Sequence, residues 1–163
     1  MGPELAVREN GIRKGGIPKK LFVDEEKVSS VADVLSNLGE KKHDVSTLAI
    51  KRLEGLRFVG NAKVVLRLVP FKDLRDLSDP SALSGRLRRL GCVHCEEADG
   101  PRAIAQNKPF GANVVFASKS SGMFVQHYRE ENGIIRLCFE YPDSLPFDGS
   151  NCLVAVRCMT KSG

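Results

Sequence analysis

The segment GMFVQHYREENGIIRLCFEY, residues 122–141, contains two apolar runs on either side of a short charged stretch. Asn132 and Gly133 end that stretch, and Asn-Gly is the dipeptide most strongly associated with a tight β-hairpin turn. After the turn, alternate residues are large and apolar, as expected for one face of a strand: Ile135, Leu137, Phe139 and Tyr141. The segment therefore predicts a β-hairpin and a fold built around a sheet.

Two side chains in this hairpin have reactive chemistry. His127 shares a predicted strand face with Met123 and Val125, so we expect a core or sheet-surface histidine. Cys138 lies on the face of Arg136, with no base in register to activate the thiol. We therefore interpret this segment as sheet rather than as a reaction site.

Further strands are predicted on both sides of the hairpin. Val64, Leu66 and Leu68 alternate with polar residues in a strand that ends at Pro70. NVVFAS (113–118) and NCLVAVRCM (151–159) are also β-rich and bounded by turn residues, and a short helix is predicted around 81–90. Such a succession of antiparallel strands at short spacing favours a β-sandwich or a barrel.

The best predicted helix is DEEKVSSVADVLSNLG, residues 24–39. We expect Asp24 to be its N-cap, because a side-chain oxygen there can accept from the first free backbone amides. Apolar residues then recur at helical spacing, and Gly39 provides a stop. The predicted organisation is a flexible basic arm over 1–20, a helix and loop over 21–44, and a β domain over 45–163.

Composition narrows the functional classes. The chain has 163 residues, 42% of them hydrophobic and 28% charged, and a formal net charge of +5, which favours an anionic partner. No window approaches the roughly 20 apolar residues of a membrane span, and the N-terminus lacks the apolar stretch of a signal peptide. Five cysteines without such a signal are most simply reduced thiols in a cytoplasmic compartment.

Basic residues occur in the arm and in three clusters beyond it. Such clusters can contact successive RNA phosphates without reading sequence, although they can also be a solvated face or lie against anionic lipid. The candidate RNA-binding residues are Arg8, Arg13, Lys14, Lys19, Lys20, Lys41, Lys42, Lys51, Arg52, Arg86, Arg88 and Arg89.

A metal site and a catalytic site have weaker support. Cys92 and Cys95 have the C-x2-C spacing of one half of a zinc site, but no second knuckle supplies the other two ligands. Simple thiols are the main expectation there. No nucleophile elbow, H-E-x-x-H sequence or Walker A loop is present, so no catalytic residue is predicted.

Several short motifs resemble, in their order, the 30K superfamily of plant-virus movement proteins, in particular its tombusvirus-like members. They are VVLRLVP (64–70), LRDLSD (74–79), QHY (126–128), IIRLCFE (134–140), PFDG (146–149) and LVAVR (153–157). The family-motif residues are Asp76, Gln126, His127 and Gly149, with Asp73 an alternative to Asp76. The long basic tail of many relatives has no counterpart here.

The resemblance implies a mainly β, antiparallel, jelly-roll-like β-sandwich with an N-terminal helix and a basic flexible arm. It also implies a non-enzymatic protein without a cofactor, which binds single-stranded RNA without sequence preference, associates with itself and with membranes, and acts at the cell periphery or plasmodesmata of a host cell. Two alternatives stay open: a small jelly-roll capsid protein that packages RNA through its arm, and a cellular domain stabilised by zinc at Cys92 and Cys95.

Overall fold

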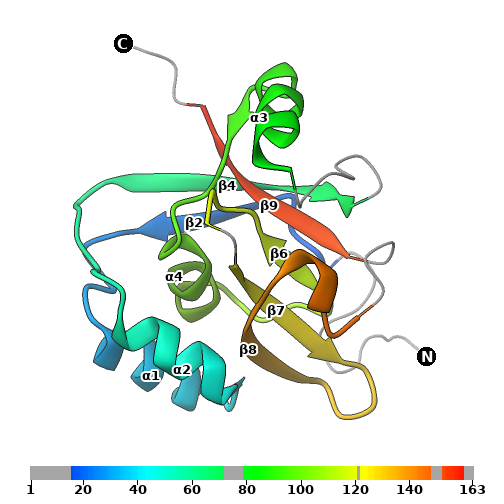
Figure 1. Ribbon diagram of the computed structural model, residues 1–163. Helices are drawn as coiled ribbons and strands as arrows, with labels where there is room; N and C mark the ends of the chain where they lie inside the picture. The colour runs from blue at the N-terminus through cyan, green and yellow to red at the C-terminus, as the bar shows by residue number, and fades with distance from the viewer. Residues whose placement is uncertain (1–15, 72–78, 121, 148–151, 160–163) are drawn as a thin grey trace.

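The computed structural model describes residues 16–71, 79–120, 122–147 and 152–159. Within these ranges eight strands form one curled sheet accompanied by four α-helices (Figure 1). The sheet order is β2 (Lys20–Asp24), β4 (Lys63–Pro70), β9 (Leu153–Cys158), β6 (Val114–Phe116), β7 (Met123–Arg129), β8 (Ile134–Glu140) and β3 (Asp44–Val45), with β5 (Cys92–Val93) also paired to β9. The helices are α1 (Val31–Glu40), α2 (Thr47–Glu54), α3 (Pro80–Arg89) and α4 (Asp99–Gln106), with a short 3-10 helix, η2, at Pro142–Ser144.

The strand pairings confirm a sheet-rich fold but not a wholly antiparallel one. The β3–β8 and β6–β9 ladders are parallel, and the remaining ladders are antiparallel. Parallel neighbours need a crossover connection, which repeated hairpins cannot provide. The sheet is therefore mixed, and this arrangement does not confirm a jelly-roll sandwich.

The predicted hairpin is present as β7 and β8. Their ladder runs without interruption from the Met123–Glu140 pair to the Arg129–Ile134 pair. Gly133 closes the turn at a φ of 72°, a left-handed conformation that glycine adopts without steric penalty. Its amide donates to the Arg129 carbonyl at 2.7 Å. The Asn-Gly signal thus located the turn correctly.

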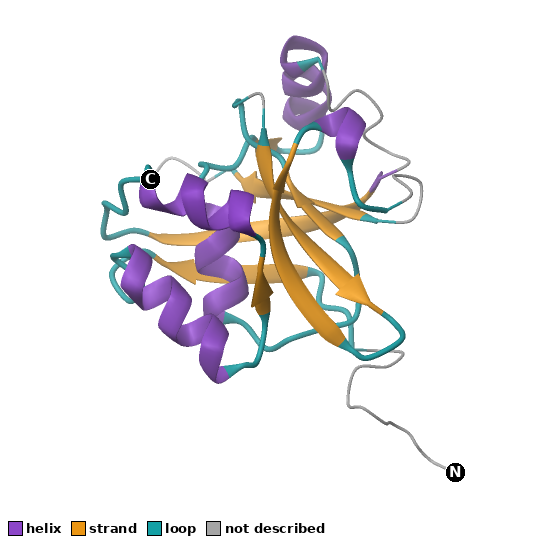
Figure 2. Ribbon diagram, turned by 60° about the horizontal axis from the view of Figure 1, so that its bottom comes forward, coloured by secondary structure: helices purple, strands orange, loops and turns teal. Residues whose placement is uncertain are grey.

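The two faces of the sheet are covered differently. α1, α2 and α4 lie together on one face, where Leu66, Phe124 and Leu137 contribute to the main core (Figures 1 and 2). α3 lies apart from them, and its Leu83 and Leu87 pack in a second buried cluster with side chains of the opposite sheet face. Beyond α3, part of this second face is left accessible on β7 and β8.

α1 begins later than predicted. Asp24 is not its N-cap, because this residue ends β2 and pairs with Lys63. Ser30 is the cap instead, and its hydroxyl accepts from the Asp33 amide at 3.1 Å. The predicted helix therefore combined the end of a strand, a turn and the true helix. No helix within the described ranges is long and apolar enough to cross a membrane.

Candidate nucleic-acid interface

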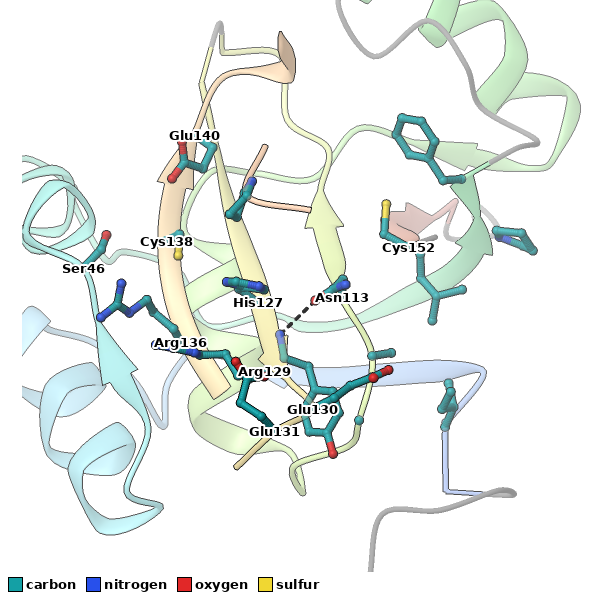
Figure 3. A pocket seen from close by; sticks show the side chains of 18 residues that line it. Ser46, Asn113, His127, Arg129, Glu130, Glu131, Arg136, Cys138, Glu140 and Cys152 are labelled. Atoms are coloured by element: carbon teal, nitrogen blue, oxygen red, sulfur yellow. Dashed lines mark hydrogen bonds between the residues drawn. The ribbon is translucent and has the colours of Figure 1, made fainter. Parts of the chain in front are cut away.

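An open groove lies over the accessible face of the β7–β8 hairpin (Figure 3). Strand alternation turns Leu137 and Phe139 towards the helices, so Arg136, Cys138 and Glu140 face the groove. The same alternation on β7 brings His127 and Arg129 to this side. The groove has a volume of about 990 Å³, and we call it the hairpin groove.

The middle of the hairpin groove contains His127 and Arg136, which are directly opposite each other in the β7–β8 ladder. Burial lowers the pKa of His127, and the charges of Arg129 and Arg136 lower it further, against a smaller effect of Glu131. The imidazole is therefore mainly uncharged at neutral pH. The fixed positive charge of the groove belongs to the two arginines.

Neither arginine is neutralised within the described part of the chain. No ion pair there involves Arg129 or Arg136, and the buried Nε of Arg136 has no hydrogen-bond partner. A guanidinium offers five N–H donors in a fixed planar fork that matches phosphate oxygens. The groove therefore presents two arginines that have no ion-pair partner among the described residues.

Aromatic and amide side chains form the rest of the groove. Phe71 and Tyr128 line it, and the Phe147 ring centroid lies 5.7 Å from that of His127. Asn113 positions β7, because its Oδ1 accepts from the Tyr128 amide at 2.9 Å (Figure 3). Aromatic faces beside cations are typical of surfaces that bind single-stranded nucleic acid.

Three carboxylates also line the groove, one more than its two arginines. Glu140 lies near one end of the groove, and Glu130 and Glu131 lie near the other, with His127 and Arg136 between them (Figure 3). The Glu140 carboxylate accepts from the Ser144 hydroxyl at 3.3 Å. Cationic character is thus confined to the centre of the groove, which suits a short run of phosphates rather than a long polyanion.

The predicted basic clusters do not form one surface. Arg8, Arg13 and Lys14 lie outside the described residues, whereas Lys19 and Lys20 are exposed at the start of β2. Lys51 and Arg52 are on α2, on the helix-covered face, and the cluster of Arg86, Arg88 and Arg89 is on α3, on the other side of the sheet.

Two of the predicted RNA contacts are engaged within the protein. The Lys41 ammonium donates to the Ala105 carbonyl at the C-terminal end of α4. Arg52 forms a two-bond ion pair with Glu97 and lies over the Phe139 ring. Lys42, Lys51, Arg88 and Arg89 are exposed, and Arg86 is half-buried.

Of the family-motif residues, Asp76 and Gly149 lie outside the described ranges, as does Asp73. Gln126 is buried, and its amide nitrogen donates to the carbonyls of Phe110 at 3.3 Å and Ala112 at 3.0 Å. It therefore holds the chain before β6 against β7. His127 is the one described motif residue that lines the hairpin groove.

The two thiols of the C-x2-C motif have separate partners. Cys92 contacts the Leu90 carbonyl at 3.6 Å, and Cys95 contacts the Ala155 carbonyl at 3.2 Å. Burial raises the pKa of both thiols, which disfavours the thiolate that zinc requires. Within the described residues, no group of three or more histidine, cysteine, aspartate or glutamate side chains is placed to hold a metal ion.

Reasoning from the sequence did not identify Arg129 and Arg136 as candidates. Both lie in the hairpin, which the sequence pattern indicates to be sheet, and neither belongs to a cluster of basic residues. The available signal was their position at alternating sites on the polar face of two strands joined by a short turn.

No family model, no curated protein and no solved structure matches this chain.

Proposed function

We propose that this protein binds single-stranded RNA without sequence preference and that the hairpin groove makes its principal phosphate contacts. The observation that supports this most directly is the pair Arg129 and Arg136, which have no ion-pair partner in the described part of the chain and flank an uncharged His127. An RNA phosphate would satisfy their donors with charge-assisted hydrogen bonds.

The dimensions and chemistry of the groove favour a single strand. Its volume of about 990 Å³ is large enough to hold a nucleotide. Phe71 and Tyr128 are packed partly against the two buried clusters and also line the groove, where an aromatic ring can stack on a base irrespective of its identity. Phosphate contacts and stacking both tolerate any sequence, so the expected binding is unselective.

We further propose that RNA binding serves a non-enzymatic role as a viral movement protein in a host cell. This step is based on the resemblance of the ordered motifs to those of the 30K superfamily, and the jelly roll of that family stays a prediction. Self-association and contact with anionic membranes are parts of the same proposal. Closed, uniform shells of the purified protein in electron micrographs would contradict the movement role and favour a capsid subunit.

RNA binding is tested by fluorescence anisotropy with three unrelated 20-nucleotide RNAs. We expect similar affinities for all three, and a loss of about tenfold or more in the Arg129→Ala/Arg136→Ala double variant, because charge-assisted hydrogen bonds are lost. Arg57→Ala is the matched control, since Arg57 is an exposed arginine outside the groove. Wild-type affinity in the double variant, or binding of one RNA alone, would contradict the proposal.

A further inference from the structure

A second cavity, of about 540 Å³, lies between α3, β5 and the residues that follow β6, and we call it the α3 cavity. Its polar lining comes from separate segments: Ser84 and Arg88 of α3, His94 after β5, and Ser118 and Lys119 after β6. It shares no lining residue with the hairpin groove. Nothing in the proposed RNA-binding function uses it.

Two buried polar side chains in this cavity lack a protein partner. His94 is 7% exposed and Ser118 is 6% exposed, so both are removed from bulk water. The Nε2 of His94 and the Oγ of Ser118 form no hydrogen bond in the protein. A buried polar group without a partner destabilises the fold unless a ligand or water satisfies it. The two atoms therefore point to an occupant of the cavity.

The Nε2 of His94 can donate a hydrogen bond into the cavity. Its Nδ1 lies 3.5 Å from the Ser84 hydroxyl, which can donate to this nitrogen and leave the proton of the neutral ring on Nε2. Burial lowers the pKa of His94, and the charge of Lys119 lowers it further. Lys119 is thus a positive charge near the imidazole. The environment of Nε2 therefore favours an anion over a cation.

The other charges agree with this assignment. Arg88 and Lys119 are exposed and form no ion pair within the described ranges. Glu97 also lines the cavity, but it is paired with Arg52 and accepts from Ser120 at 3.1 Å. Glu96 is the remaining carboxylate. The lining therefore has two cations without an ion-pair partner among the described residues and one such carboxylate.

We propose that the α3 cavity binds a phosphate group, free or esterified, with His94 Nε2–H and Ser118 Oγ–H as buried donors and with Lys119 and Arg88 balancing its charge. An apolar ligand would leave both donors unsatisfied, and a cation would face Lys119. The cavity is larger than a phosphate ion, so there is room for an organic group beside Val93 and Met159, which are exposed side chains of its lining.

The test is calorimetric titration of the full chain, at constant ionic strength, with inorganic phosphate, adenosine 5′-monophosphate and adenosine. Phosphate, the monophosphate or both should bind, and adenosine should not. Equal affinity for the first two indicates that the phosphate group suffices, and tighter binding of the monophosphate indicates an esterified ligand. In NMR spectra the His94 imidazole resonances should shift on saturation, whatever shift the His127 resonances show, since His127 reports on the hairpin groove.

Ser118→Ala removes one buried donor with little change of volume, and it should weaken binding by about tenfold. His94→Phe removes the other donor; if this variant does not fold, Ser118→Ala and the His94 resonances still provide the test. Ser36→Ala, at an exposed site on α1, is the matched control. The proposal is overturned if neither phosphate compound binds, which would leave water as the occupant, if Ser118→Ala binds like the wild type, or if the shifts occur at His127 alone.

Discussion

Asp99 has no exposed surface, yet both of its side-chain oxygens have hydrogen-bond partners. Its two oxygens accept from Arg157 of β9 at 2.7 and 3.0 Å, and Oδ2 also accepts from the Glu96 amide. Arg157 in turn contacts Glu25 at 3.3 Å, and Glu25 lies 3.7 Å from Arg102. These residues connect β9, α4 and the turn after β2, so we interpret the network as structural.

Replacing this carboxylate should therefore be costly. Asp99→Asn removes the closer of the two counter-ions of Arg157 and leaves only Glu25, and we expect the free energy of unfolding to fall by about 3 kcal/mol. Arg52→Ala removes an exposed ion pair with Glu97 and should change it by about 1 kcal/mol or less. Urea unfolding at pH 7 measures both values. Equal effects of the two substitutions would show that the network is not a stabilising element.

The three histidines make stability depend on pH. Burial lowers the pKa of His43, His94 and His127 below the ordinary value of about 6.5, and nearby lysines or arginines lower each of them further. Between the folded and unfolded pKa values the unfolded chain binds more protons. The contribution is therefore fully present above about pH 6.5 and is lost as the pH falls below it.

We expect the free energy of unfolding to decrease between pH 7.5 and pH 5.5, a range in which ordinary carboxylates stay ionised. Urea titrations measure this decrease, and NMR titration of the imidazole protons should give three pKa values below about 6.5. Stability that is constant or increases as the pH falls would contradict the burial of these rings.

The cysteines should differ in reactivity towards iodoacetamide in the native protein. Cys92, Cys95 and Cys138 are buried, and burial raises the pKa of each thiol, to about 11 for Cys138. Cys152 and Cys158 are only partly buried. Because the thiolate is the reactive form, we expect mass spectrometry at pH 8 to find these two alkylated first. Rapid alkylation of Cys95 would show that the core is open.

At the scale of elements, two amide side chains protect the edge of the sheet. Gln106 exchanges hydrogen bonds with the backbone of Asp24, at 2.7 and 2.8 Å, and Asn107 does the same with Phe22, at 3.4 and 2.9 Å. These bonds engage the backbone N–H and C=O groups on the outer edge of β2, as the backbone of a further strand would. An unpaired edge is a template for association between chains.

Gln106→Met/Asn107→Leu should release this edge. We expect lower stability and concentration-dependent association, which sedimentation velocity can detect. Asn37→Leu, on α1, is a comparison that removes one amide without touching β2. A double variant that sediments like the wild type at every concentration would mean that the two amides do not protect the edge.

Local patterns predicted some elements well and others poorly. The β7–β8 hairpin, β4 and α3 have clear signals: an Asn-Gly turn, alternating apolar residues and a charged segment that follows Asp79. α4 has a weak signal, because it is short and contains Gly100 and Pro101, which are poor helix formers, and because nearly all of its residues are buried, polar ones included. Only tertiary packing reveals this helix.

The start of α1 shows how two signals can merge. Asp24 is a good helix cap by type, and acidic residues follow it, as in a first helical turn. Pairing with β4 competes for the same residue and prevails, because β2 buries Leu21 and Val23 in the main core. Residues 21–24 thus belong to a strand. The predicted helix and loop over residues 21–44 did not include this strand.

At the scale of the whole molecule, sequence clusters were a poor guide to the binding surface. Arg52 and Lys41 belong to predicted clusters, but each is engaged by another part of the chain. Arg129 and Arg136 are single basic residues in the sequence, and the β7–β8 ladder brings them together with His127. Charge density along a chain therefore does not identify which cations are available; the ion pairs formed on folding do.

The salt dependence of RNA binding tests the central proposal most directly. For a single strand, the logarithm of the binding constant should fall linearly with that of the salt concentration, with a slope of about −0.7 for each neutralised phosphate. If Arg129 and Arg136 each contact one phosphate, the double alanine variant should have a slope smaller in magnitude by about 1.4 than that of the wild type, while Arg57→Ala should not differ from the wild type. Identical slopes for the double variant and the wild type would contradict the assignment of RNA to the hairpin groove.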